Sequence, residues 1–221
     1  TIGGEEYTFK KVQFSEREGK DQSIGWVAKR FIKPFSKCKH VNGNKIIFDV
    51  STEITGLDDP NCCEFPTVKK VTHRFNSGMR RFKAGRSGGD RFHAACDLYR
   101  YKDEEILSVA PGKVIQGVEY FYLGTYSLVI EHSGGFVVRY GEITSKKARN
   151  ISLGKTVSMG QNIGYIGQVE ANVRPMLHFE LYDGSETGPL TVRSDAKNKF
   201  QRRKDLMNPT DYLLKWEASS F

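Results

Sequence analysis

Short runs of apolar residues, punctuated by glycine, dominate the chain from residue 65 onward. Residues 106–115 form a run that breaks at a Pro-Gly pair, residues 127–132 and 136–140 are two runs joined by Ser-Gly-Gly, and residues 157–166 carry two glycines. Runs of this length between turn residues are typical of β-strands, and their spacing predicts an antiparallel sheet or sandwich. We therefore expect a mainly β protein.

Helix is expected to be sparse. One short helix is predicted over residues 209–216, with Asn208 as its N-cap and Pro209 at the first helical position, where the missing N–H has no consequence.

The first 64 residues form a different region. Residues 1–40 show short strand-like runs and end in IGWVAKRFIKPF. This ending resembles the last strands of a bacterial Src-homology-3-like barrel, and a truncated barrel or a simple β-extension would show the same pattern. Residues 41–64 are expected to be a connecting segment with one strand at 45–50. The predicted organisation is a small β module (1–40), this connection (41–64) and one domain over 65–221.

Charge and composition indicate which partners the protein is expected to have. The net charge is +8 and the pI is about 9.2, which favours polyanionic surroundings. The basic residues are scattered and lack the aromatic-interleaved stripe of a nucleic-acid reader, so no nucleic acid partner is expected. No run of eighteen or more apolar residues occurs, so no membrane span is expected. The chain opens at Thr1 without a signal pattern, which suggests a processed or trimmed chain and leaves export open.

The four cysteines, Cys38, Cys62, Cys63 and Cys96, lie outside any CxxC spacing. A cysteine-based structural zinc site is therefore not expected. Cys38 could pair with Cys62 or Cys63 in an oxidising compartment, or all four could be free, small apolar residues.

Two histidines lie in settings suited to a metal. His93 and Asp97 are separated by three small residues in HAACD. Four extended residues span roughly 13 Å, whereas ligands lie about 2 Å from one ion, so the segment must bend between the two side chains. In MLHFELY, strand alternation places Met176, His178 and Glu180 on one face. Two histidines and one carboxylate are the ligand set of a catalytic zinc with an open coordination position.

These segments resemble the lysostaphin-type (LytM-like) zinc endopeptidases of peptidoglycan. HAACD matches the HxxxD motif of that family, and LHFEL matches the distal half of its HxHFE motif. Between them, SVAPGKVI, YSLVIEHSGGFVVRYGEI and ISLGKTVSMGQNIGYIG resemble other strands of the family, so the resemblance covers roughly residues 65–185. It implies that His93, Asp97 and His178 bind one Zn²⁺ per chain. It also implies an antiparallel sheet that forms the floor of a groove, with loops as its walls.

Two departures affect the expected chemistry. The family usually has histidine where this chain has Met176 and Glu142, so both of its non-ligand catalytic histidines are missing. Alternation places Tyr140 and Glu142 on the same strand face, and we predict that Glu142 points at the metal and acts as the general base. The alternative is a surface carboxylate beside an idle metal site.

The remaining expected site residues support the ligands or orient the substrate. They are Glu180, Arg139, Tyr140 and Met176, and for Arg139 and Glu180 an ordinary salt bridge is an equal alternative. His132 is expected to be structural, whereas His40 and His73 are expected to be solvated or turn histidines.

The resemblance implies a zinc-dependent endopeptidase that cuts peptide stems or cross-bridges in peptidoglycan, in the periplasm or outside the cell. A catalytically degenerate module that binds the wall or a partner protein is the alternative. The YGE and MLHFELY segments, preceded by a barrel-like module, also resemble segments of secreted antibacterial effectors. This resemblance implies an immunity or secretion partner protein.

Overall fold

The computed structural model describes residues 9–14, 23–28 and 54–221 except residue 196. The chain divides into two compact units, Thr1–Thr52 and Glu53–Phe221. In the first unit, β1 (Phe9–Phe14) pairs antiparallel with β2 (Ser23–Ala28). One such pair does not establish the predicted barrel-like module. The strand expected at 45–50 lies outside the described residues.

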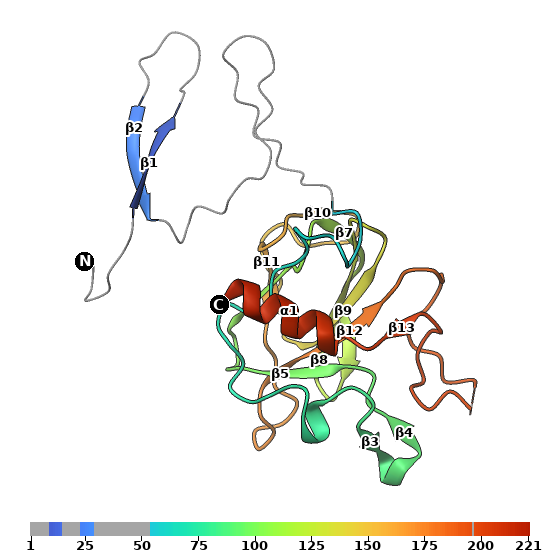
Figure 1. Ribbon diagram of the computed structural model, residues 1–221. Helices are drawn as coiled ribbons and strands as arrows, with labels where there is room; N and C mark the ends of the chain where they lie inside the picture. Colours follow the sequence, from blue (N-terminus) through green and yellow to red (C-terminus); the bar gives the residue numbers. More distant parts are fainter. Residues whose placement is uncertain (1–8, 15–22, 29–53, 196) are drawn as a thin grey trace. The chain divides into compact units, whose positions relative to one another are not determined.

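A seven-stranded sheet forms the centre of the second unit (Figure 1). The strand order is β10-β7-β8-β9-β12-β13, and β5 also pairs with β12. Each pairing is antiparallel, which confirms the predicted sheet. The strands are β5 (Cys96–Tyr99), β7 (Gly112–Tyr122), β8 (Thr125–His132), β9 (Val137–Ile143), β10 (Thr156–Val157), β12 (Met176–Tyr182) and β13 (Leu206–Met207).

Two smaller strand pairs complete the described β structure of this unit. β6 (Glu105–Leu107) pairs with β11 (Asn162–Tyr165), and β3 (Gly85–Arg86) pairs with β4 (Arg91–Phe92). Two short 3₁₀ turns, η2 (Gly78–Arg80) and η3 (Ser87–Gly89), lie beside the second pair along the chain.

One face of the large sheet is buried in the main hydrophobic core. On β12, Leu177, Phe179 and Leu181 belong to this core, as the alternation of MLHFELY predicts. Helix α1 (Thr210–Ser220) lies against this face, where Trp216 meets Phe179 edge to face at 6.2 Å. The opposite face of β12 carries His178 and Glu180, and its last residue, Tyr182, belongs to a second, smaller hydrophobic cluster.

The helix begins one residue after the predicted start and extends past the predicted end. Asn208 Oδ1 accepts hydrogen bonds from the Thr210 N–H at 3.1 Å and from its hydroxyl at 2.7 Å. The N-cap is Pro209, so the predicted N-cap at Asn208 is wrong by one residue. Asn208 still satisfies the N–H group of the first helical residue.

A β-bulge interrupts β9 at Glu142. Ile143 is opposite Tyr126 on β8, whereas Gly141 is opposite the next residue, Ser127, so Glu142 has no partner on β8. Its φ is +57°, the left-handed conformation typical of a bulge. The extra residue changes which side chains of β9 share a face.

The structure joins Cys62 and Cys63 in a disulfide, and Cys96 is free and buried. This pairing differs from the predicted bond to Cys38, which lies outside the described residues. Among the described residues, no helix is long and apolar enough to cross a membrane.

Candidate metal centre

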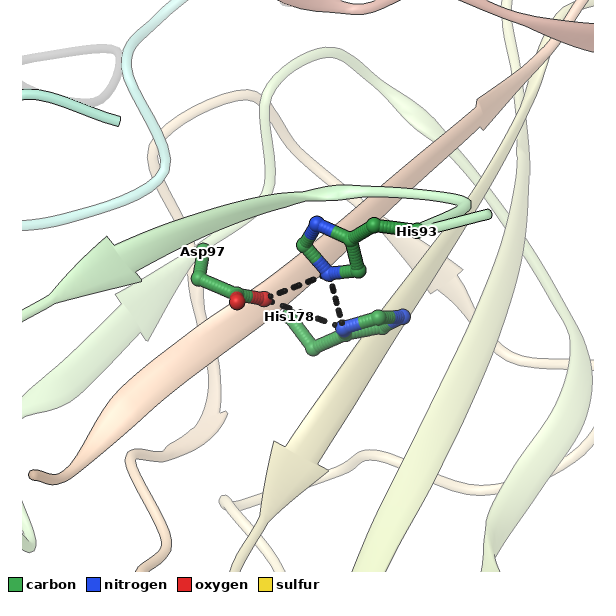
Figure 2. A group of neighbouring side chains, drawn as sticks. All are labelled: His93, Asp97 and His178. Atoms are coloured by element: carbon green, nitrogen blue, oxygen red, sulfur yellow. Dashed lines mark hydrogen bonds and ion pairs between the residues drawn. The ribbon is translucent and has the colours of Figure 1, made fainter. Parts of the chain in front are cut away.

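Three side chains from separate positions converge on one point (Figure 2). His93 follows β4 directly, and the buried Ala94 and Ala95 carry the chain from it to Asp97 in β5. β5 pairs with β12 in a register that sets His178 opposite Asp97. Pairing of these two strands therefore brings together two side chains that are 81 residues apart in the sequence.

The three facing atoms form a nearly equilateral triangle. His93 Nε2 lies 3.3 Å from His178 Nδ1 and 3.0 Å from Asp97 Oδ1, and His178 Nδ1 lies 3.1 Å from the same oxygen. Tetrahedral zinc with bonds of about 2.0–2.1 Å separates its ligand atoms by about 3.3 Å. The spacing of the three atoms fits that geometry.

The second nitrogen of each imidazole is already engaged. His93 Nδ1 lies 2.9 Å from the Arg81 carbonyl oxygen, so it is this nitrogen that carries the proton. His178 Nε2 lies 3.0 Å from Glu180 Oε1 and donates to that carboxylate. The lone pairs of the other two nitrogens, His93 Nε2 and His178 Nδ1, are therefore directed at Asp97 and at each other.

Electrostatics make Asp97 anionic. Burial alone raises the pKa of Asp97, but hydrogen bonds and charge from His178 and His93 outweigh burial and lower it to about 2. Burial lowers the pKa of His93, whereas Asp97 and Glu180 outweigh burial at His178 and raise its pKa to about 9. Two lone pairs and a carboxylate this close require a positive charge among them, either a proton or a metal ion.

Glu180 supports the site from behind His178. The side chain is fully buried, and its Oε1 accepts from His178 and from Arg202 Nε at 2.8 Å. Its Oε2 accepts from Arg139 Nη1 at 3.1 Å and from the Tyr182 hydroxyl at 2.5 Å. A carboxylate on the far nitrogen of a histidine ligand fixes its tautomer and ring orientation. Arg139 and Glu180 are therefore engaged with each other and with His178.

Glu142 lies near this centre, but for a different reason from the one predicted. Tyr140 and Phe179 are opposite each other and both point into the core, so alternation without a bulge would turn Glu142 away from the site. The bulge instead leaves the Glu142 carboxyl close enough to His178 for its charge to act on the pKa of Glu142. Burial is the largest effect and raises that pKa to about 7.

The structure does not bring Tyr140 to the metal centre. Its hydroxyl accepts from the Val109 N–H at 3.2 Å and lies 3.1 Å from His132 Nε2. His132 is buried and its Nδ1 lies 2.9 Å from the Ala110 carbonyl oxygen, in agreement with the predicted structural role. Met176 is buried on the same strand as His178, two residues before it.

Three residues around the centre carried no signal in the sequence. Phe121 from β7 lies beside His178 with ring centroids 5.6 Å apart, and Arg202 reaches Glu180 from the segment between β12 and β13. Arg86 Nη2 lies 3.6 Å from Asp97 Oδ2. Phe121 and Arg202 depend on long-range packing, and Arg86 stands in a run that looks like an ordinary solvated loop.

Comparison with known proteins finds similarity to one family of peptidases. Residues 91–189 match the sequence model of peptidase family M23. Lysostaphin from Staphylococcus simulans matches with 18% identity and a TM-score of 0.47, over 69% of this chain and 55% of that chain. A zinc containing peptidase from Vibrio cholerae matches with 26% identity and a TM-score of 0.45, over 58% of this chain and 41% of that chain.

LytU matches with 21% identity and a TM-score of 0.47, over 69% of this chain and 98% of that chain. The chain thus spans about half the length of lysostaphin. No curated protein matches its sequence.

Proposed function

We propose that the chain is a zinc-dependent peptidase that hydrolyses peptide bonds in bacterial peptidoglycan, and the match of residues 91–189 to the sequence model of peptidase family M23 supports this proposal. The observation that carries the proposal is the convergence of His93, Asp97 and His178, whose facing atoms are spaced for tetrahedral zinc. These three side chains would hold the ion and leave one coordination position open.

Zinc in this position supplies a Lewis acid that lowers the pKa of water towards 7 and polarises a peptide carbonyl. The side chains of the protein supply the remaining steps. Glu142 accepts a proton from the water molecule as its oxygen attacks the carbonyl carbon. The same carboxyl then gives the proton to the amine nitrogen as the C–N bond breaks. A pKa of about 7 suits both steps, because Glu142 can take up and release the proton near neutral pH.

Neighbouring groups leave Glu142 available for this work. No hydrogen bond or ion pair of its carboxyl is found within the described part of the chain, so no partner has to be displaced before it accepts a proton. Glu180 accepts a hydrogen bond from His178 Nε2 and would thereby keep the Nδ1 lone pair of His178 free to hold the ion. Phe121 packs beside the His178 ring, with the ring centroids 5.6 Å apart.

The proposal is tested with purified peptidoglycan. We expect the recombinant protein to contain about one zinc per chain and to release new amino groups from this material. Glu142→Gln should retain zinc and lose about 100-fold or more of the activity, which is the usual contribution of a general base. Glu131→Gln is the control, because Glu131 is an exposed carboxylate of β8. Undiminished activity in Glu142→Gln would remove the base assignment.

A second candidate function is a degenerate module that binds the wall without cutting it. Met176 favours this candidate, because a thioether cannot donate a hydrogen bond to the developing oxyanion as a histidine can. Tight binding to peptidoglycan with no release of amino groups at any zinc concentration would decide for it.

We also propose a place of action. A net charge of +8 suits retention at an anionic cell wall, which supports action in the cell envelope or outside the cell. The role of a secreted antibacterial effector rests on the sequence resemblance alone. Delivery to the periplasm of a susceptible bacterium, with lysis as the readout, tests it.

A further inference from the structure

Two basic segments flank the metal centre. Residues 78–91 and 193–204 together hold eleven lysine and arginine residues but two aspartates. Phe200 of the second segment stacks on Phe82 of the first at 5.0 Å, and the Phe92 N–H donates to the Lys199 carbonyl at 2.9 Å. The two segments therefore form one continuous basic region beside the site.

Arg86 is the member of this region that stands next to the ligands. Its Nη2 donates to the Met79 carbonyl oxygen at 2.7 Å and lies 3.6 Å from Asp97 Oδ2. Its Nη1 is buried and has no hydrogen-bond partner among the described residues. The side chain as a whole keeps 24% of its surface exposed, so part of it is accessible to an approaching molecule although Nη1 itself is buried.

Nearby carboxylates do not neutralise Arg86 at hydrogen-bond distance. Asp97 uses its other oxygen for His93 and His178, and 3.6 Å is long for a charge-assisted hydrogen bond. Glu142 feels the charge of Arg86, which lowers its pKa against the effect of burial, but the two side chains form no ion pair. An unpaired guanidinium donor next to a reaction centre is unfavourable unless a ligand satisfies it.

We propose that Arg86 binds a carboxylate of an acidic peptide substrate beside the metal centre. The planar guanidinium matches the two oxygens of a carboxylate, and turning Nη1 outward completes such a pair. The basic region around Arg86 increases the local concentration of an anionic substrate. This inference rests on the proposed function, since it names the chemical class of substrate for the same site.

The test compares purified peptidoglycan in two forms. In one form the carboxyl groups of the peptides are free, and in the other they have been converted to carboxamides by carbodiimide coupling to ammonia. Binding is measured by cosedimentation with the zinc-loaded Glu142→Gln protein, so that the result does not depend on cleavage. The same two materials are then given to the wild-type enzyme.

We expect the free-carboxyl form to bind more tightly, and Arg86→Gln to weaken its binding by about tenfold or more while leaving the amidated form unchanged. Arg86→Lys should retain part of the preference, because the charge stays and the paired donors are lost. Arg149→Gln is the matched control, since it removes the same charge from an exposed arginine outside both basic segments. Zinc content and thermal unfolding are measured for each variant to show that it is folded.

Two results would overturn the inference. One is equal weakening of both forms by Arg86→Gln, which would mean that Arg86 does not recognise the carboxylate. The other is an equal effect of Arg86→Gln and Arg149→Gln, which would mean that only general charge matters. Carboxylate-dependent binding without cleavage by the wild-type enzyme would instead uphold this inference and contradict the proposed peptidase.

Discussion

Replacing Glu180 by glutamine tests how the protein supports the proposed metal centre. Glu180 is fully buried and accepts hydrogen bonds from Arg139, Arg202, His178 and Tyr182. Burial alone raises its pKa, but the charges of Arg202 and Arg139 outweigh burial and hold the pKa well below its usual range. The side chain is therefore anionic at neutral pH, and Glu180→Gln leaves two arginines without their counter-charge.

The expected loss of stability follows from the burial of this network of charges. Breaking a buried ion pair by removing one partner costs about 3–5 kcal/mol. For a domain of this size, about 2–4 °C of Tm is lost per kcal/mol, so we expect Tm to fall by roughly 6–20 °C. Loss of the carboxylate behind a histidine ligand should also weaken zinc binding by about 10–100-fold.

Two assays separate these effects. Thermal unfolding with excess chelator reports the stability of the metal-free fold, and competition with a zinc-binding dye reports zinc affinity. Glu131→Gln, an exposed carboxylate on β8, is the control and should change neither value. Adding Arg202→Met to Glu180→Gln should recover part of the lost stability, because it removes one uncompensated cation. A Glu180→Gln protein with wild-type Tm and zinc affinity would refute the role of this network.

The other predictions concern pH and packing. Burial raises the pKa of Glu142 to about 7, so activity should be lost as the pH falls through about 7, and loss of activity only at the ordinary pKa of glutamate would contradict this. A Cβ at Gly141 would lie 3.0 Å from the Phe121 ring, so Gly141→Ala should lower the free energy of unfolding, measured with denaturant, by about 1–3 kcal/mol. Gly164→Ala is the control and should be tolerated, because the nearest atom to its Cβ would be 3.6 Å away. Burial lowers the pKa of His132 to about 4, so between about pH 6.5 and pH 4 only the unfolded chain binds a proton at this residue. Acidification across that range should therefore lower the free energy of unfolding by about 3 kcal/mol. His132→Gln should make the stability less dependent on pH in this range.

The sheet and the three converging side chains could be predicted from the sequence because their signals are local. Alternation in MLHFELY assigned the two faces of β12 correctly, since that strand is regular over its whole length. The three small residues after His93 allowed the bend that brings it to Asp97. In both cases a few neighbouring residues contain the necessary information.

The surroundings of Glu142 could not be predicted in the same way. The expectation that Tyr140 and Glu142 share a strand face is wrong, because the bulge at Glu142 adds one residue to β9 and breaks the two-residue period. The sequence YGE does not indicate a bulge at Glu142, because residues at positive φ are usually glycine and Glu142 is not.

The supporting arginine was missed for another reason. Arg202 meets Glu180 only because the segment between β12 and β13 folds back on the sheet, 22 residues away along the chain. In the sequence, Arg202 is one residue of a basic run of the kind usually found on solvated surfaces. The partner of a buried charge is a property of the fold, whereas the charge itself is visible in the sequence.

The central claim is that His93, Asp97 and His178 hold one zinc ion. It is tested most directly by elemental analysis of protein equilibrated with zinc and then dialysed, together with His93→Ala, Asp97→Ala and His178→Ala. We predict about one zinc per chain in the wild-type protein and loss of that zinc in each variant that remains folded. Absence of zinc from the folded wild-type protein, or equal zinc in all four proteins, would contradict the account.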